Sequence, residues 1–258
     1  MRFLITLNRT GKQRMLPMDY QYYLSAWIYR VIGKADNEFA RFLHSEGYRD
    51  GNRSFKLFAY SPLCFGKPTL WKEKALFEIH QDEVTLSVSF FLSDAAERFI
   101  IGLFNDQQVF IGDKFNGIDF TVARVERIPD AILSEMMHYR ALSPVVVSVL
   151  PDGSRYAKYL SPDDAGYAGY LKNTLVRKWN AIPNAPLLND DFVFDLSITS
   201  QPRSKLITVK PNTPQQSKIR GYVFDFDLAA PVEIHRLVIG SGLGEKCSTG
   251  FGWVEQQR

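Results

Sequence analysis

The sequence predicts an α+β fold made of two tandem halves, each with the element order βαββαβ. Apolar residues recur with strand or helix periodicity in that order over residues 1–128, and a looser version of the same order follows. Size agrees with this division, because 258 residues, of which 45% are hydrophobic, suffice for two domains with separate cores. We therefore expect a domain at 1–128, a linker at 129–142 and a domain at 143–258.

In the first half, Phe3, Ile5 and Leu7 alternate with polar residues, which is the period of a strand. Further strands are expected at 55–60, 75–80, 84–92, near 109 and at 118–128. Helices are expected at 20–32, 37–44 and 93–104. This order is the ferredoxin-like (RRM-like) split pattern.

In the second half, the same kinds of pattern recur with less regular spacing. Strands are expected at 145–150, at 191–199 and 205–210 as a pair, and at 222–228 and 251–254. Helices are expected at 163–179 and 231–238. The two halves together predict tandem ferredoxin-like domains.

The composition excludes several classes of protein. A net charge of +3 argues against a uniformly cationic nucleic-acid binder, although a local basic patch stays open. Cys64 and Cys247 form no CxxC pair, which argues against a disulfide scaffold or a zinc ribbon. Because no apolar run approaches the length of a membrane span, we expect a soluble, cytoplasmic protein in a reducing compartment.

A cluster of glycines near residue 245 needs a reason, because the whole chain has only 17 glycines. Backbone N–H groups in such a loop can face phosphate oxygens, helped by Lys246 and the Ser248 hydroxyl. The dinucleotide fingerprint and the P-loop do not fit the spacing. A flexible hinge before a last strand is the plainer alternative. The loop residues predicted to bind a phosphate backbone are Gly242, Gly244, Lys246, Ser248, Gly250 and Gly252.

Three motifs in order resemble one known family. The loop Gly242-Leu243-Gly244-Glu245-Lys246-Cys247-Ser248-Thr249-Gly250-Phe251-Gly252 looks like the signature loop of the CRISPR repeat-processing endoribonucleases, which belong to the repeat-associated RNA-binding superfamily. The segments Gln21–Leu24 and Ile28-Tyr29 resemble the family's first helix, and Phe55–Ser61 resembles its second-strand motif. The resemblance covers almost the whole chain.

The resemblance implies a metal-independent cleavage of the repeat in a long CRISPR transcript, without a cofactor. The ribose 2′-OH attacks its own 3′ phosphate and leaves a 2′,3′-cyclic phosphate and a 5′-OH. The implied partners are the precursor RNA and the processed guide RNA. Whether the product is retained in an interference complex, and whether the protein is a monomer or a homodimer, stay open.

Three residues are candidates for this chemistry, which needs proton transfer and a cation beside the phosphorane. His44 points away from the apolar stripe of its helix, and histidine serves as acid or base near neutrality. Tyr29 also points away from the core, so we expect its hydroxyl to position the RNA or donate a proton. Lys56 is expected to neutralise a phosphate. The plainer alternatives are a helix-end histidine, a packed surface aromatic and a solvated lysine.

Residues 196–224 contain basic side chains and no acidic ones, which is the pattern expected of a track for the RNA backbone. The candidate RNA-binding residues there are Arg203, Lys205, Lys210, Lys218 and Arg220. Arg49 and Arg53 are expected to add contacts near His44. An ordinary basic hairpin is the alternative. The basic residues of the helix at 163–179 are interpreted as solvated surface.

Two other functions compete with cleavage by the RNA's own hydroxyl. A relative that has lost cleavage would bind the repeat RNA without cutting it. A metal-dependent nuclease is geometrically conceivable, because Asp225 and Asp227 share one strand face. The alternation of these aspartates with phenylalanines is explained more simply by a solvent-facing strand surface.

Overall fold

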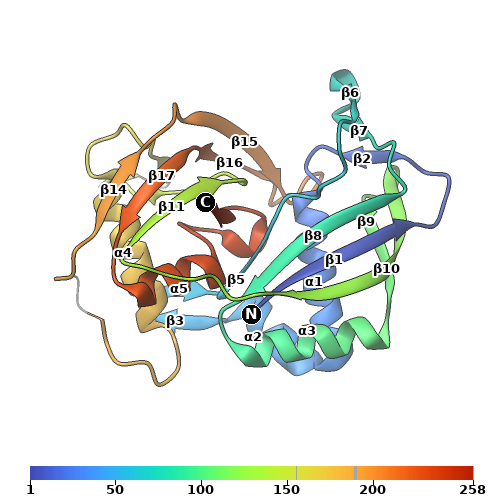
Figure 1. The fold of residues 1–258 in the computed structure, drawn as a ribbon. Coiled ribbons are helices and arrows are strands. Elements are labelled where there is room, and N and C mark those ends of the chain that lie inside the picture. Colours follow the sequence, from blue (N-terminus) through green and yellow to red (C-terminus); the bar gives the residue numbers. More distant parts are fainter. Residues whose placement is uncertain (155, 189–190, 258) are drawn as a thin grey trace.

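The computed structural model describes residues 1–154, 156–188 and 191–257. Two antiparallel sheets, each packed against helices, lie side by side and form the two halves (Figure 1). Among the described residues, none of the helices has the length and apolar composition needed to cross a bilayer.

The first half contains the elements from β1 to β10 and the helices α1 to α3. The bounds are β1 (Arg2–Arg9), β2 (Met15–Pro17), α1 (Gln21–Ala35), α2 (Asn37–Ser45), β3 (Tyr48–Asp50), β4 (Arg53–Phe55), β5 (Phe58–Tyr60), β6 (Thr69–Trp71), β7 (Leu76–Glu78), β8 (Glu83–Phe90), α3 (Ser93–Asn105), β9 (Gln108–Gly112) and β10 (Gly117–Ile128). The sheet order is β5-β8-β1-β10-β9, with β1 paired antiparallel to both β8 and β10. This is the ferredoxin-like order with β9 added at one edge.

The helix α1 packs against this sheet through its predicted apolar stripe. Leu24, Trp27 and Ile28 are buried in the core, as the helical spacing requires. The helix runs to Ala35, three residues past the expected end, because Gly33 does not stop it. Gly33 instead allows close contact with α2, since a Cβ there would lie 3.5 Å from the Cβ of Ala40.

The second half contains the elements from β11 to β18 and the helices α4 and α5. The bounds are β11 (Met136–Ala141), β12 (Ser148–Val149), β13 (Lys158–Tyr159), α4 (Tyr167–Asn180), β14 (Asp195–Ile198), β15 (Arg203–Val209), β16 (Ser217–Val223), β17 (Asp225–Ala229), α5 (Val232–Ser241) and β18 (Val254–Gln256). The sheet order β14-β17-β11-β18 repeats the ferredoxin-like arrangement. The prediction of two such halves is confirmed.

The segment expected to be a linker, 129–142, contains the first strand of the second sheet. In β11, Met137, Tyr139 and Ala141 are buried while His138 and Arg140 are exposed, so the strand has a regular period of two. The expectation of a linker up to residue 142 was therefore wrong. The strand was missed because its exposed positions carry a histidine and an arginine, so an apolar pattern alone does not mark the segment as a strand.

The expected strand at 55–60 is interrupted at Leu57. This residue has φ +53°, a left-handed conformation that costs energy outside glycine. Its side chain leaves the first half and is buried in the core of the second half. Burial of a leucine offsets the backbone cost, and the interruption separates β4 from β5.

Two further differences concern strand pairing in the second half. Of the expected strand at 145–150, only Ser148–Val149 is regular strand, and Val145 makes an isolated bridge to Tyr222. The run 205–210 does not pair with 191–199, because β15 pairs with β16 in a separate hairpin. The expected strand at 222–228 is divided between β16 and β17, on either side of Phe224.

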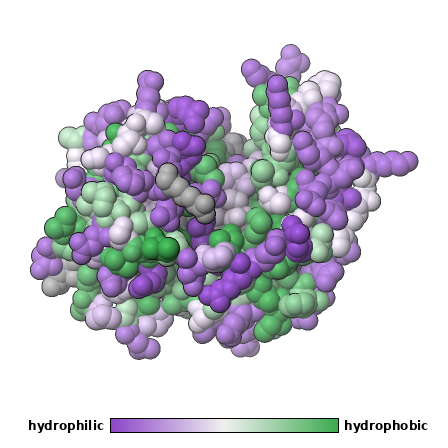
Figure 2. Space-filling view, viewed as in Figure 1, coloured by the Kyte–Doolittle hydropathy of each residue, from purple (hydrophilic) through white to green (hydrophobic). Residues whose placement is uncertain are grey.

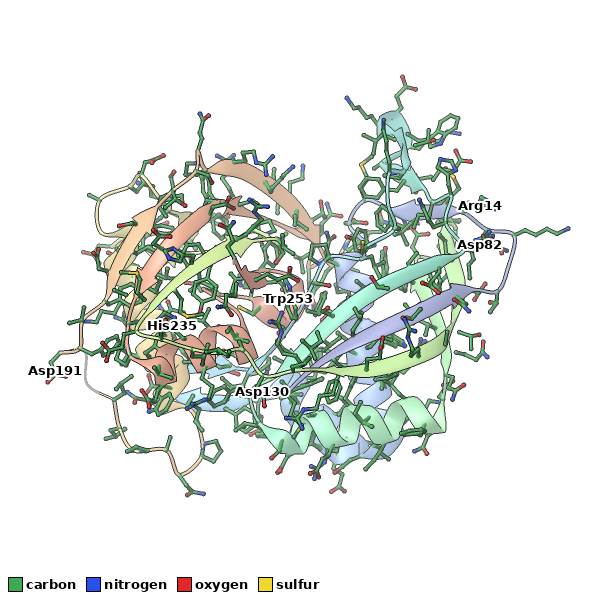
Figure 3. The ribbon with its side chains drawn as sticks, viewed as in Figure 1. Arg14, Asp82, Asp130, Asp191, His235 and Trp253 are labelled. Carbon is green, nitrogen blue, oxygen red and sulfur yellow. The ribbon has the colours of Figure 1, made fainter. Side chains whose placement is uncertain are left out.

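Contacts across the interface join the halves. The guanidinium of Arg2 in β1 lies 4.5 Å from the ring centroid of Trp253, which occupies the centre of the molecule between the sheets (Figure 3). On α4, Arg177 Nε donates to Asp50 Oδ2 of β3 at 2.7 Å. Arg177 is thus an interface residue, which corrects its interpretation as solvated surface. The contacts of Arg2 and Arg177 therefore fix the two halves relative to each other, and with them any site that lies between the halves.

Candidate active site

The short helix α2 presents His44 in its last turn. Its start is capped, because the Asp36 carboxylate accepts a hydrogen bond from the Phe39 N–H at 2.9 Å. Asp36 also pairs with Arg98 of α3 at 2.9 Å, which ties α2 to the rest of the half. The His44 imidazole is exposed at the carboxyl end of the helix, where the helix dipole favours a positive charge.

Tyr29 of α1 contacts His44 edge to face. The ring centroids are 5.1 Å apart and the ring planes meet at 82°. The tyrosine ring also lies 5.5 Å from Phe58 of β5, so it is packed as well as close to the histidine. Burial raises the pKa of Tyr29 to about 12, and a hydrogen bond with the Ser248 side chain lowers it in part. The hydroxyl keeps its proton near neutral pH and is therefore a donor rather than a base.

Lys56 lies just before the interruption of the strand, and its side chain passes over the end of α2. A Cβ on Gly47 would lie 2.9 Å from Lys56 Nζ, so only glycine leaves room for the amine. Lys56 Nζ donates to Ser54 Oγ at 3.3 Å. Burial, with Arg49 adding to the effect, lowers the pKa of Lys56 to about 8, while Glu46 acts in the opposite direction.

A cleft of about 580 Å³ opens between the halves beside Lys56. Cations from both halves line it: Arg53, Lys56, Lys178, Lys210 and Lys246. The carboxylate of Glu245 also lines it and lies 4.0 Å from Arg53. Because cations outnumber the carboxylate, the cleft favours an anionic ligand. Two residues predicted from different motifs, Arg53 and Lys210, are thus brought to one surface.

The glycine loop crosses from the second half to α1 of the first. The Ser25 hydroxyl of α1 donates to the Ser248 carbonyl at 2.7 Å, which places Ser248 beside Tyr29. Lys246 is exposed, and Ser248 is half-buried at the edge of the cleft. Both residues line the cleft, together with their loop neighbours Glu245, Cys247 and Thr249.

The loop glycines have a different role from the predicted one. Gly242, Gly244, Gly250 and Gly252 are buried and have positive φ. A Cβ on Gly252 would lie 2.0 Å from the Leu243 carbonyl oxygen. The N–H groups of Gly242, Gly250 and Gly252 donate to carbonyls of the protein itself. Those three N–H groups cannot face a phosphate, so the glycines shape the loop that carries Lys246 and Ser248.

Sequence reasoning missed Lys178, which is only 4% exposed. Its Nζ donates to the Gly242 carbonyl at 2.8 Å and to the Ser241 carbonyl at 3.3 Å, where α5 ends. It also lies 3.3 Å from Cys247 Sγ. The sequence does contain a signal for this burial, because Lys178 lies at helical spacing from Leu171 and continues the buried stripe of α4. Interpretation of Lys178 as solvated surface was wrong.

The predicted basic track is divided by the register of the β15–β16 hairpin. Lys218 pairs opposite Thr208 and Arg220 opposite Leu206, on the face away from buried Val209. Lys205 and Arg203 have the opposite strand parity, so they lie on the other face. All the basic side chains are exposed, and hydrophilic residues dominate the surface over this hairpin (Figure 2). Lys210, at the turn, reaches the cleft.

Asp225 and Asp227 of β17 each interact with a neighbouring basic side chain. Asp225 forms a bidentate pair with Arg140, both distances being 2.9 Å. Its hydrogen bond with Arg140 lowers the pKa of Asp225. Asp227 accepts from His138 at 2.6 Å. Both carboxylates thus pair with basic side chains on the solvent-facing side of the strand. This agrees with the interpretation of a solvent-facing strand surface rather than a metal site.

The fold and the site define a class: a protein of two ferredoxin-like halves with a cation-lined cleft between them, and with a histidine and a tyrosine in contact on the helices of the first half. Models of a known family match both halves. The model described as "CRISPR associated protein Cas6, C-terminal" matches residues 126–256, and that described as "CRISPR-associated protein Cas6, N-terminal" matches residues 15–126. The chain belongs to the Cas6 family of CRISPR-associated proteins.

Curated relatives agree over almost the whole chain. A "CRISPR-associated endoribonuclease Cas6 1" of Methanocaldococcus jannaschii is 26% identical, with 95% of this chain and 89% of the relative covered. A "Putative CRISPR-associated endoribonuclease-like protein Cas6" of Pyrococcus furiosus is 24% identical, with 99% of this chain and 98% of the relative covered.

Solved structures share the fold. The structure described as "Characterization of a Cas6-related gene from Pyrococcus furiosus" has a TM-score of 0.82 at 22% identity, and covers 100% of this chain and 98% of its own. The structure described as "CRISPR associated protein Cas6" has a TM-score of 0.77 at 24% identity, with 100% of this chain and 99% of that structure's chain covered.

Proposed function

We propose that the protein is an endoribonuclease that binds CRISPR repeat RNA and cuts the precursor transcript into guide RNAs without a metal ion. One observation carries the proposal: Tyr29 contacts His44 on one side and Ser248 on the other, and Ser248 lines the cationic cleft. Family membership supports the substrate, since curated relatives are described as CRISPR-associated endoribonucleases.

The reaction needs no external nucleophile, because the attacking oxygen belongs to the RNA. The 2′-oxygen bonds to the adjacent phosphorus as its proton leaves, and the bond from phosphorus to the 5′-oxygen breaks as that oxygen gains a proton. The products are a 2′,3′-cyclic phosphate and a 5′-OH. The protein's task is to move protons and to stabilise charge on the phosphorane.

Each candidate residue has a role that its surroundings support. His44 is exposed at a helix end and transfers a proton to or from the RNA. Tyr29 keeps its proton and donates a hydrogen bond to the scissile ribose or phosphate. Lys56 is partly desolvated, so its charge acts on the phosphorane with less screening than at an open surface.

The test is a single-turnover assay with the repeat RNA of the neighbouring CRISPR array, in excess chelator. We expect full cleavage and fragments that end in a 2′,3′-cyclic phosphate. Tight binding without cleavage would instead support the non-cleaving alternative. Cleavage that stops in chelator would contradict attack by the RNA's own hydroxyl in the absence of a metal.

A further inference from the structure

A second hollow meets the candidate site from the side of the helices. It is a groove of about 420 Å³ between α1 and α2, and Tyr29 and His44 lie on its wall. Arg30, Lys34 and Arg41 line the same groove. We propose that this groove holds the RNA backbone on the side of the cut that leads away from the glycine loop. The inference rests on the proposed function and adds a binding surface to it.

The groove exists because the two helices touch through small residues. Gly33 and Ala40 meet at the bottom, with 3.5 Å between the Ala40 Cβ and a Cβ built on Gly33. Larger side chains stand on either side, so the surface between the helices is hollow. A flexible chain can lie in such a hollow without any movement of the helices.

The charges in the groove are unevenly compensated. Lys34 pairs with Asp106 at 3.1 Å, and the nearby carboxylate of Asp36 is occupied by Arg98. Arg30 and Arg41 are exposed, and neither lies within ion-pair distance of a carboxylate in the described ranges, although the charge of Arg30 also acts on Asp106 from farther away. Unpaired arginines that face a hollow suit phosphate groups, because the guanidinium offers several donors to phosphate oxygens.

The groove and the cleft meet at the candidate catalytic residues. Tyr29 lies on the wall of the groove, while its hydroxyl bonds to Ser248 of the cleft. An RNA strand whose scissile phosphate lies at His44 must leave the site in two directions. The cleft beside Lys56 offers one path and the groove beside Arg41 offers the other. RNA on both sides of the cut is thereby held, which fixes the scissile bond.

The test uses the double variant Arg30→Gln/Arg41→Gln, with Lys12→Gln/Lys114→Gln as the control that removes the same two charges from exposed loops outside the groove. Affinity is measured for the whole repeat and for each of the two cleavage products, over a series of salt concentrations. We expect affinity for the whole repeat to fall on the order of tenfold. The salt slope should fall by about 1.4, for two contacts with single-stranded RNA. Affinity should fall for one product and stay unchanged for the other.

Three outcomes decide the matter. Unchanged affinity of the double variant for the whole repeat, with normal binding by the wild type, would overturn the groove. Equal losses for both products would also overturn it, because the arginines would then act only through general charge. Failure of the wild type to bind or cut the repeat would instead refute the proposed function. Matching thermal unfolding of variant and wild type shows that the variant is folded.

Discussion

Lys178 Nζ donates a hydrogen bond to the carbonyl oxygen of Gly242 at 2.8 Å. This contact joins α4 to the point where α5 gives way to the glycine loop. The amine takes the place of a C-terminal cap, because the last carbonyls of a helix have no partner within it. The start of the loop that carries Ser248 toward Tyr29 is therefore held in place by the Lys178 side chain of α4.

Replacement of this anchor should destabilise the protein. Lys178→Met retains much of the apolar stem but leaves the carbonyls of Ser241 and Gly242 without their donor. We expect the free energy of unfolding to fall by about 1–3 kcal/mol, the cost of unsatisfied buried groups. Urea denaturation measures it, with exposed Lys158→Met as the control. Equal unfolding midpoints for the two variants would contradict the anchoring role.

Loss of the candidate histidine should remove most of the chemistry. His44→Ala is expected to slow single-turnover cleavage by roughly 10²- to 10⁴-fold, the usual contribution of a general acid or base. Binding should change little, because the proposed RNA-binding surface includes many other residues. Tyr29→Phe and Lys56→Ala should each cause smaller losses. The control is His80→Ala, whose ring pairs with a threonine hydroxyl outside the site. Wild-type cleavage by His44→Ala would make that histidine structural.

The pH dependence of cleavage should report on Lys56. Burial lowers the pKa of this lysine to about 8, so the positive charge is present below that pH and is lost as pH rises through it. With the protein below saturation, the cleavage rate should therefore decline above about pH 8 once the uncatalysed reaction is subtracted.

At saturation the decline should move to higher pH, because a bound phosphate stabilises the ammonium. The matched variant Lys56→Arg should keep its charge and show no decline that depends on this group. A wild-type profile identical to that of Lys56→Arg would show that the Lys56 charge does not contribute.

Two glycines of the second half should respond to alanine with opposite signs. Gly252 has φ +68° and no space for a Cβ, so Gly252→Ala should lower the free energy of unfolding by about 1–3 kcal/mol. Gly169 lies within α4, and a Cβ there meets nothing within 4 Å. Gly169→Ala should raise stability by up to about 1 kcal/mol, since alanine favours helix. Chemical denaturation of both variants measures the difference, and changes of the same sign would contradict the packing argument.

The basic residues of the hairpin should contribute unequally to RNA affinity. Lys210 lines the cleft, whereas Arg203 lies at the far end of β15. Lys210→Gln should weaken binding of the repeat RNA and reduce the salt slope by about 0.7, the value for one phosphate contact with a single strand. Arg203→Gln should have less effect. A filter-binding titration in several salt concentrations tests this, and equal losses would mean that the RNA follows the whole hairpin.

Patterns local to the sequence predicted most of the fold. The stripe of α1 and the alternation of β1 led to the ferredoxin-like order, because one face of each element must be apolar. The strand β11 was not predicted. His138 and Arg140 occupy its outer positions, and its few inner residues do not distinguish it from a connecting segment. Leu57 could not be predicted either. Its left-handed backbone depends on a pocket formed by residues far away in the sequence.

The candidate site was accessible to sequence reasoning only in part. Tyr29 and His44 were predicted from helix faces that point away from the core; His44 is exposed, whereas Tyr29 also packs against the core. The loop glycines were assigned to phosphate binding because their burial depends on tertiary contacts that no local pattern reveals. Lys178 was missed for a related reason. A lysine is expected at the surface, and the carbonyls that justify its burial belong to another helix.

The contact between Tyr29 and Ser248 joins residues that are made at very different times during translation. Tyr29 lies in α1, and Ser248 lies in a short 3-10 turn, Cys247–Thr249, that comes after α5. A ribosome that has released only the first half has therefore produced His44 and Tyr29 without the loop that completes their surroundings. The surroundings of Tyr29 are therefore complete only after synthesis of the second half has reached the glycine loop.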